Sequence, residues 1–245
     1  MAPRLSWSNL QAASRATIDI GRAARSMAYA RRHGLVGRDW ADWGRRLSRT
    51  VARWSLREAL ALWLTPLNCV RYFEFDFARR HLPATFERLL DVSSPRLFPL
   101  RTASERPTAI VVAINPDKGD LDYTARLSDG LRLRNLELRC TTVEALDETQ
   151  RGFDVVTSIS VIEHIAGEDG DSRAIESLYA RLRPGGRLLL TVPVDREFRL
   201  EYRDEQTYDA PTDVVDGRCF YSRYYDLASI EARLLSRCEG AQVVL

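Results

Sequence analysis

An acid and an imidazole, Glu163 and His164, stand side by side directly after an apolar run. Because imidazole titrates near neutral pH, His164 is a candidate catalytic base for a substrate hydroxyl, with Glu163 beside it. The alternative is that the pair only shapes the wall of a binding site. The residues before the pair, 153–159, read FDVVTSI, which is typical of a strand buried on both faces. We therefore expect Glu163 and His164 in the loop that leaves the carboxyl end of this strand.

Short apolar runs alternate with helical patterns from residue 87 onward. The runs are ERLLDV, TAIVVAI, LELRC, FDVVTSI, GRLLLTV and, at residues 241–245, AQVVL. Helical patterns are expected around 97–104, 121–130, 172–182 and 223–236, and Pro184-Gly185-Gly186 predicts a tight turn before the fifth run. This order predicts an α/β fold with a doubly wound, mostly parallel sheet in which residues 153–159 are central. Ligands bind such sheets at the carboxyl ends of the strands.

Residues 1–70 are expected to form a basic helical extension, and residues 71–245 the α/β domain. Residues 1–60 carry twelve arginines against four acids, a net charge of +8, although the whole chain carries only +2. All five tryptophans lie at or before Trp63, several of them at helical spacing. We expect this extension to dock on the domain as a cap. A membrane-surface or nucleic-acid contact through the basic helices is the less favoured alternative.

The four cysteines are far apart and show no CxxC spacing or His-containing cluster, so we expect no metal site. Separated thiols and the lack of an apolar leader segment favour a cytoplasmic protein. The most apolar helical stretch, LREALALWLTPLNCV, contains Glu58 and Pro66 and is too short to span a bilayer. These features indicate an ordinary globular domain and leave the oligomeric state open.

Two segments together point to a family. FDVVTSISVIEHI is followed some twenty residues later by RLRPGGRLLLTVPV, and the pair resembles the fourth strand with its loop, the next helix and the fifth strand of class I S-adenosylmethionine-dependent methyltransferases. The resemblance covers roughly residues 85–245, where FERLLDVSS, AIVVAINPD and RCTTVEAL are similar to the first three strands and their loops. It implies a Rossmann-like methyltransferase fold, S-adenosylmethionine as cofactor and methyl transfer to a small-molecule acceptor.

The resemblance also assigns site residues. Asp91 would be the first-loop acid near the cofactor's ammonium group, and Asn115 would bind the ribose, with Asp117 as the nearby alternative. Thr142 would contact the edge of the adenine. The family's glycines would be replaced by Ser93 and Ser94, and the wall of the site would contain Ser158 and Ser160. Residues 201–225 form either a substrate-recognition element or a packed surface loop, and the candidates for substrate contact there are Tyr202, Tyr208, Phe220 and Tyr221.

The chain departs from the family's pattern at the cofactor loop. DVSSPRL contains none of the usual glycines, and neutral Asn115 and Thr142 stand where acids are usual. We expect the backbone N–H groups of Ser93 and Ser94 to face the methionine carboxylate. Two readings follow: a working transferase, or a non-enzymatic binding or scaffold domain of the same fold. The chain also ends in what resembles the sixth strand, so either it is truncated or its sheet is shorter than the family's.

Overall fold

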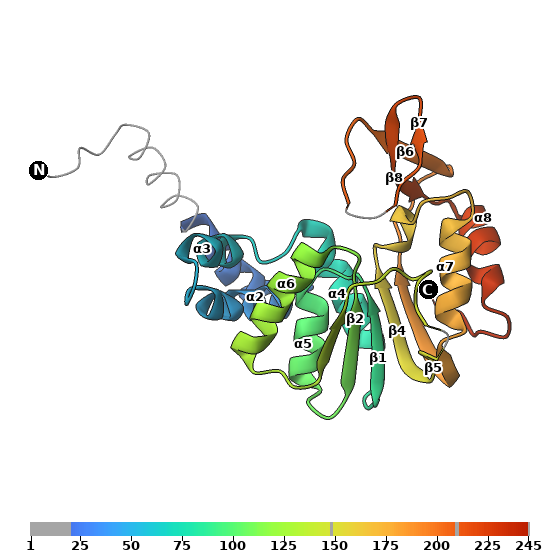
Figure 1. The fold of residues 1–245 in the computed structure, drawn as a ribbon. Coiled ribbons are helices and arrows are strands. Elements are labelled where there is room, and N and C mark those ends of the chain that lie inside the picture. The colour runs from blue at the N-terminus through green and yellow to red at the C-terminus, as the bar shows by residue number, and fades with distance from the viewer. Residues whose placement is uncertain (1–20, 148, 209–210, 245) are drawn as a thin grey trace, which may run out of the picture. The chain divides into compact units, whose positions relative to one another are not determined.

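The computed structural model describes residues 21–147, 149–208 and 211–244 (Figure 1). The chain divides into two compact units, Met1–Phe77 and Ala78–Leu245. The boundary falls within helix α4 (Cys69–His81) rather than at residue 70. None of the described helices is both long enough and apolar enough to cross a membrane.

The described part of the first unit is helical, as expected. It contains residues 21–33, α2 (Arg38–Val51), α3 (Leu56–Leu64) and the start of α4. Trp40 is buried against Phe75, with 4.9 Å between the ring centroids. At Gly37, whose φ is 71°, a Cβ would lie only 2.5 Å from the Tyr72 carbonyl oxygen, so α2 begins where only glycine fits. Docking of this unit as a cap stays a prediction.

The second unit contains a five-stranded parallel sheet in the order β3-β2-β1-β4-β5. Its strands are β1 (Arg88–Val92), β2 (Ile110–Ile114), β3 (Leu136–Arg139), β4 (Phe153–Ile159) and β5 (Leu182–Thr191). All seven residues of β4 are buried, and β4 lies between β1 and β5. The predicted fold class is therefore confirmed, and β4 is an inner strand.

Helices cover both faces of the sheet (Figure 1). Successive residues of a strand point to opposite faces, so each strand contributes to two core clusters. One core cluster packs strand residues such as Leu90 and Val156 with α7 (Gly170–Tyr179). The other packs Leu89 and Val155 with α5 (Leu97–Glu105). Helix α6 (Lys118–Leu131) contacts α5 and β3. This layering places the loops after β1, β2 and β4 at one edge of the sheet.

Three local expectations were wrong. Pro184-Gly185-Gly186 lies inside β5 as a register shift against β4 rather than as a separate turn, and Gly185 has a φ of 78°. A Cβ on Gly186 would lie 3.0 Å from the Phe153 carbonyl oxygen, so the strands approach too closely there for a larger residue. Residues 241–244 form no strand, because they are exposed and pair with no other segment of the described chain. The helical segment near the end begins at Leu227, not at residue 223.

Residues 199–224 contain a second sheet that the sequence did not predict. It is antiparallel, in the order β6-β8-β7, and consists of β6 (Arg199–Arg203), β7 (Val214–Val215) and β8 (Arg218–Tyr224). Three short helical segments follow: α8 (Leu227–Ser229), a π-helical turn (Ile230–Leu234) and a 3₁₀ turn (Leu235–Arg237). The small sheet contacts the turn that carries Glu163 and His164.

Candidate functional site

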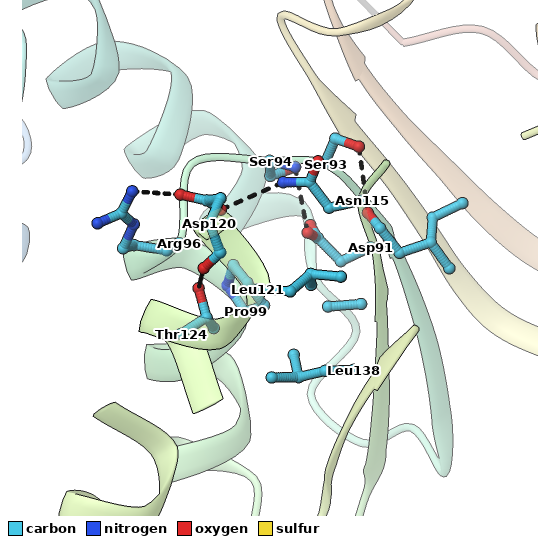
Figure 2. Close-up of a pocket in the computed structure, with 12 residues that line it drawn as sticks. Asp91, Ser93, Ser94, Arg96, Pro99, Asn115, Asp120, Leu121, Thr124 and Leu138 are labelled. Atoms are coloured by element: carbon cyan, nitrogen blue, oxygen red, sulfur yellow. Dashed lines mark hydrogen bonds and ion pairs between the residues drawn. The ribbon is translucent and has the colours of Figure 1, made fainter. Parts of the chain in front are cut away.

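A cavity of about 230 Å³, open to solvent, lies at the carboxyl ends of β1 and β2 (Figure 2). Its position agrees with the rule that ligands bind parallel sheets at this edge. Four of the residues predicted for the cofactor line it: Asp91, Ser93, Ser94 and Asn115. The other lining residues are Arg96, Pro99, Ala113, Ile114, Asp120, Leu121, Thr124 and Leu138.

Asp91 is buried at the end of β1, with an exposed fraction of 1%. Its carboxylate accepts hydrogen bonds from the Thr157 hydroxyl at 2.7 Å and from the Ser94 backbone N–H at 3.2 Å. Burial raises its pKa to about 6, although both hydrogen bonds act in the opposite direction. The carboxyl group is thus held by neutral donors alone among the contacts of the described chain, and a cationic ligand group would stabilise its ionised form.

The two serines of the cofactor loop do not offer their N–H groups to the cavity, contrary to expectation. Ser93 N–H donates to the Ile114 carbonyl oxygen at 2.8 Å, and its hydroxyl donates to the same oxygen at 3.1 Å. The Ser94 N–H is used by Asp91. Ser93 has a φ of 48°, in the left-handed region where glycine is favoured. The Ser94 hydroxyl is buried beside the Asp91 carboxylate and is a further neutral donor that acts to lower the pKa of Asp91.

Polar side chains after β2 form a connected network on the other wall (Figure 2). The Asn115 side-chain oxygen accepts from the Asp117 N–H at 2.9 Å, and its Nδ2 donates to Asp120 at 3.2 Å. Asp117 caps α6 by accepting from the Asp120 N–H at 2.9 Å, and it does not line the cavity. Arg96, the first-loop residue directly before α5, forms an ion pair with Asp120. The network therefore joins both cofactor loops.

The remaining predicted wall residues lie away from this cavity. Thr142 accepts a hydrogen bond from the Ala145 N–H at 3.3 Å in a local turn. Ser158 is fully buried inside β4, and its hydroxyl has no hydrogen-bond partner in the described residues. Ser160 has a φ of 50° as the chain leaves β4, and its N–H donates to Thr191. None of the three lines the cavity.

Glu163 and His164 lie in a single 3₁₀ turn, Ile162–His164, just beyond β4. His164 Nδ1 is 2.6 Å from the Tyr221 carbonyl oxygen, which can only accept, so Nδ1 carries the proton. Nε2 is then the acceptor atom, 3.3 Å from the Tyr208 hydroxyl and 3.8 Å from a Glu163 carboxylate oxygen. Glu163 is 2% exposed. This tautomer presents the basic nitrogen of His164 rather than a donor.

The four predicted aromatic residues separate into two groups. Tyr208 and Tyr221 stack at 5.8 Å, and both rings contact His164, at 4.6 and 5.0 Å between centroids. Tyr202 and Phe220 instead pack on each other edge to face at 5.9 Å. The Arg203 guanidinium lies over the Tyr221 ring. Only the first group therefore accompanies the candidate base.

Buried Arg223, from β8, holds the loop after His164. It donates to the carbonyl oxygens of Ile165, at 2.5 Å, and Gly167. Its Nε lies 3.6 Å from Asp171, which is fully buried and also pairs with Arg233. These charges lower the pKa of Asp171 even though its burial acts the other way. Arg223 thereby fixes the loop that positions His164.

Among the polar residues in or beside the cavity that were not foreseen are Arg96, Asp120 and Thr157. Arg96 and Asp120 are charged residues at the starts of α5 and α6, which a parallel sheet brings to the same edge. Thr157 is one of three polar residues in β4, and it stands opposite Asp91 in the register of β1 and β4. Its place in the run FDVVTSI was the one available signal.

The chain has relatives of known kind. Residues 96–188 match the family model described as a methyltransferase domain. A ubiquinone biosynthesis O-methyltransferase of Ruegeria pomeroyi is 31% identical over 132 residues, covering 49% of this chain and 52% of the relative. A protein of the same name from Coxiella burnetii is 22% identical over 136 residues, covering 56% of each chain. The chain thus spans about half the length of the curated relatives it matches.

Among solved structures, a glycopeptide N-methyltransferase, MtfA, complexed with S-adenosyl-L-methionine, is similar over 66% of this chain and 79% of its own. The TM-score is 0.48 and the sequence identity 15%. The family model begins after β1 and its loop, so it covers β2, β3, β4 and most of β5 but not Asp91, Ser93 or Ser94.

Proposed function

The chain belongs to the class I S-adenosylmethionine-dependent methyltransferase family, and from this premise we propose that it transfers a methyl group from S-adenosylmethionine to a hydroxyl of a small molecule. S-adenosylmethionine supplies the methyl group as an electrophilic sulfonium substituent. The protein's part is to bind the two reactants in line and to remove the proton of the acceptor.

The observation that carries the proposal is the chemistry of the cavity at the carboxyl ends of β1 and β2. Asp91 supplies a buried carboxyl group, with only neutral hydrogen-bond donors among its described contacts, for an ammonium. Ser94 supplies a buried hydroxyl beside Asp91, and Leu121 and Leu138 supply apolar walls. A cation, polar groups and an apolar ring system are the parts of the proposed cofactor, so these residues fit it.

His164 is the proposed base. Its proton is fixed on Nδ1 by the Tyr221 carbonyl oxygen, so Nε2 can accept a proton from an acceptor hydroxyl. Tyr208 and Tyr221 supply aromatic surface beside it, which suits a planar acceptor. Support for oxygen as the methylated atom comes from the relatives, which are named O-methyltransferases.

A non-enzymatic domain of the same fold is the second candidate. It is favoured by the loop after β1, where the Ser93 and Ser94 N–H groups bind the chain itself. The cavity is also a shallow hollow that is open to solvent rather than an enclosed pocket. Such a domain would bind neither the cofactor nor its product.

Calorimetric titration with S-adenosylmethionine and with S-adenosylhomocysteine separates the two candidates. We expect wild type to bind both. If wild type and Ser93→Gly bind neither at millimolar concentration while circular dichroism shows folded protein, the enzyme proposal is wrong.

A second measurement tests the base. Wild type is expected to move labelled methyl from S-adenosylmethionine to catechol, used as a probe acceptor, and His164→Gln to be roughly 100-fold slower. An equal rate in the variant would mean that His164 only shapes the wall.

A further inference from the structure

Asp120 is a carboxylate in the cavity to which the family resemblance gives no role. It lies in the first turn of α6, and its side chain is 22% exposed. One carboxylate oxygen pairs with Arg96, and the other lies 3.2 Å from Asn115 Nδ2 (Figure 2). Each oxygen therefore accepts from one N–H group of the chain, at the edge of the sheet where the proposed cofactor binds.

The two residues expected to bind the ribose are committed to other contacts. The Asn115 side-chain oxygen already accepts from the Asp117 N–H at 2.9 Å. Asp117 in turn caps α6 through the Asp120 N–H and is not among the residues that line the cavity. A single amide oxygen in use is a poor acceptor for two hydroxyl protons, whereas a carboxylate has about four acceptor sites. Asp120 is the carboxylate of this loop that lines the cavity.

We propose that Asp120 accepts both hydroxyl protons of the cofactor's ribose, and that Arg96 occupies this carboxylate until the cofactor arrives. The inference rests on the proposed function, since it concerns the same cofactor. The two N–H groups now on Asp120 stand in for the two O–H donors of a diol.

Arg96 is placed so that it can leave. Its side chain is 39% exposed, and its guanidinium lies 4.6 Å above the Tyr123 ring, which remains as a contact when the ion pair breaks. Ion pairs of this exposure contribute little to stability, so a ligand displaces the guanidinium cheaply. Arg96 also lines the cavity, and its withdrawal enlarges the space for a ligand. It thus acts as a selectivity residue that yields only to a ligand with good donors.

The test measures binding rather than turnover. S-adenosylhomocysteine and its 2′-deoxy analogue are titrated by calorimetry into wild type, Asp120→Asn, Arg96→Gln and the control Asp122→Asn. Asp122 lies on the same helix, is exposed and pairs with Lys118 outside the cavity. Wild type and Asp122→Asn are expected to lose tenfold or more in affinity for the deoxy analogue, because the carboxylate loses a hydrogen bond.

Asp120→Asn is expected to bind S-adenosylhomocysteine about tenfold more weakly and to lose little more with the deoxy analogue. Arg96→Gln should bind S-adenosylhomocysteine a few-fold more tightly, since no ion pair has to break. Discrimination of the 2′-hydroxyl that survives in Asp120→Asn but disappears in Asn115→Ser would overturn this inference and leave the proposed function standing. Absence of binding by wild type and Ser93→Gly alike would overturn both.

Discussion

Two buried aspartates lie on neighbouring strands, one near the amino end of its strand and the other near the carboxyl end. Asp154, at the amino end of β4, accepts from the N–H groups of Glu87 and Arg88 at 2.8 and 2.7 Å and pairs with Arg183 at 2.5 Å. Asp91, at the carboxyl end of β1, accepts only from neutral hydroxyl and backbone N–H donors among the described residues. The charge of Asp154 is thus compensated within the described chain, whereas that of Asp91 is not.

The difference separates stability from binding. The contacts that compensate the charge of Asp154, at the amino end of β4, also hold the start of β1 to β4. The folded protein needs this connection at all times. At the carboxyl end of β1, Asp91 has no cationic partner among its described contacts, and this lowers the stability of the folded protein. A positively charged ligand group would offset that loss. Each substitution below changes residues at only one end of the strands.

The largest effect on stability is expected for Asp154, at the amino end of β4. Asp154→Ala leaves two backbone N–H groups and Arg183 without their acceptor, so the free energy of unfolding should fall by about 3–5 kcal/mol. Urea unfolding of the variant and of the exposed control Asp122→Ala measures this loss. Under conditions where the variant is folded, its affinity for S-adenosylmethionine should stay within about twofold of wild type. A tenfold loss would contradict the idea that Asp154 serves stability and not binding.

The next effect is the pH dependence caused by Asp91. Its pKa is about 6 in the folded protein against an ordinary 3.8, so the unfolded chain loses this proton at lower pH. Stability therefore falls as pH rises from about 4 to about 6 and stays at the lower value above, by about 3 kcal/mol in total. Asp91→Asn lacks this contribution, so its free energy of unfolding should gain on wild type over that interval. Parallel curves from pH 4 to 7 would show that Asp91 titrates normally.

A smaller effect is expected for binding at the carboxyl edge. Asp91→Ala should weaken S-adenosylmethionine binding at least tenfold, because loss of a charge-assisted hydrogen bond costs roughly 1.5–3 kcal/mol. The same substitution should not destabilise the protein above pH 6 as Asp154→Ala does. Calorimetry on both variants, at equal folded fraction, gives the comparison, and equal affinities would remove Asp91 from the site.

The smallest effect concerns the backbone of Ser93. Because its φ is 48°, Ser93→Gly should relieve about 1 kcal/mol of strain and leave cofactor binding equal or tighter. The control is Arg132→Gly, at φ 58° at the end of α6, which should gain stability without any change in affinity. Thermal unfolding shows both gains, and a loss of stability in Ser93→Gly would mean that its hydroxyl bond to Ile114 outweighs the strain.

The sequence predicted the parallel sheet well because strands buried on both faces are nearly continuous apolar runs. It missed the small sheet because β6, RLEYR, alternates over only five residues, and β8, RCFYSRY, mixes arginine with aromatic residues without a regular alternation. Their pairing depends on contacts between strands rather than on local pattern. The helical segment near the end was placed too early for the same reason.

In the candidate site, the residues that directly follow strands were predictable, since parallel strands bring those loops together. The direction of the Ser93 and Ser94 N–H groups was not, because their acceptors, Ile114 and Asp91, depend on how two loops meet. The pairing of Arg96 with Asp120 was missed for a similar reason: 24 residues separate them in the chain.

The hydrogen bond between Thr157 and Asp91 joins residues 66 positions apart, so the two partners leave the ribosome at different times. At a synthesis rate of about 5–20 residues per second, β4 leaves the ribosome roughly 3–13 seconds after β1. During that interval Leu89 and Leu90 lack the strand that covers them in the folded protein, and Asp91 lacks its hydroxyl donor. The residues that line the cavity are therefore made before Asp91 has its hydroxyl donor, and a nascent chain that stalls before β4 exposes an apolar strand edge to chaperones and aggregation.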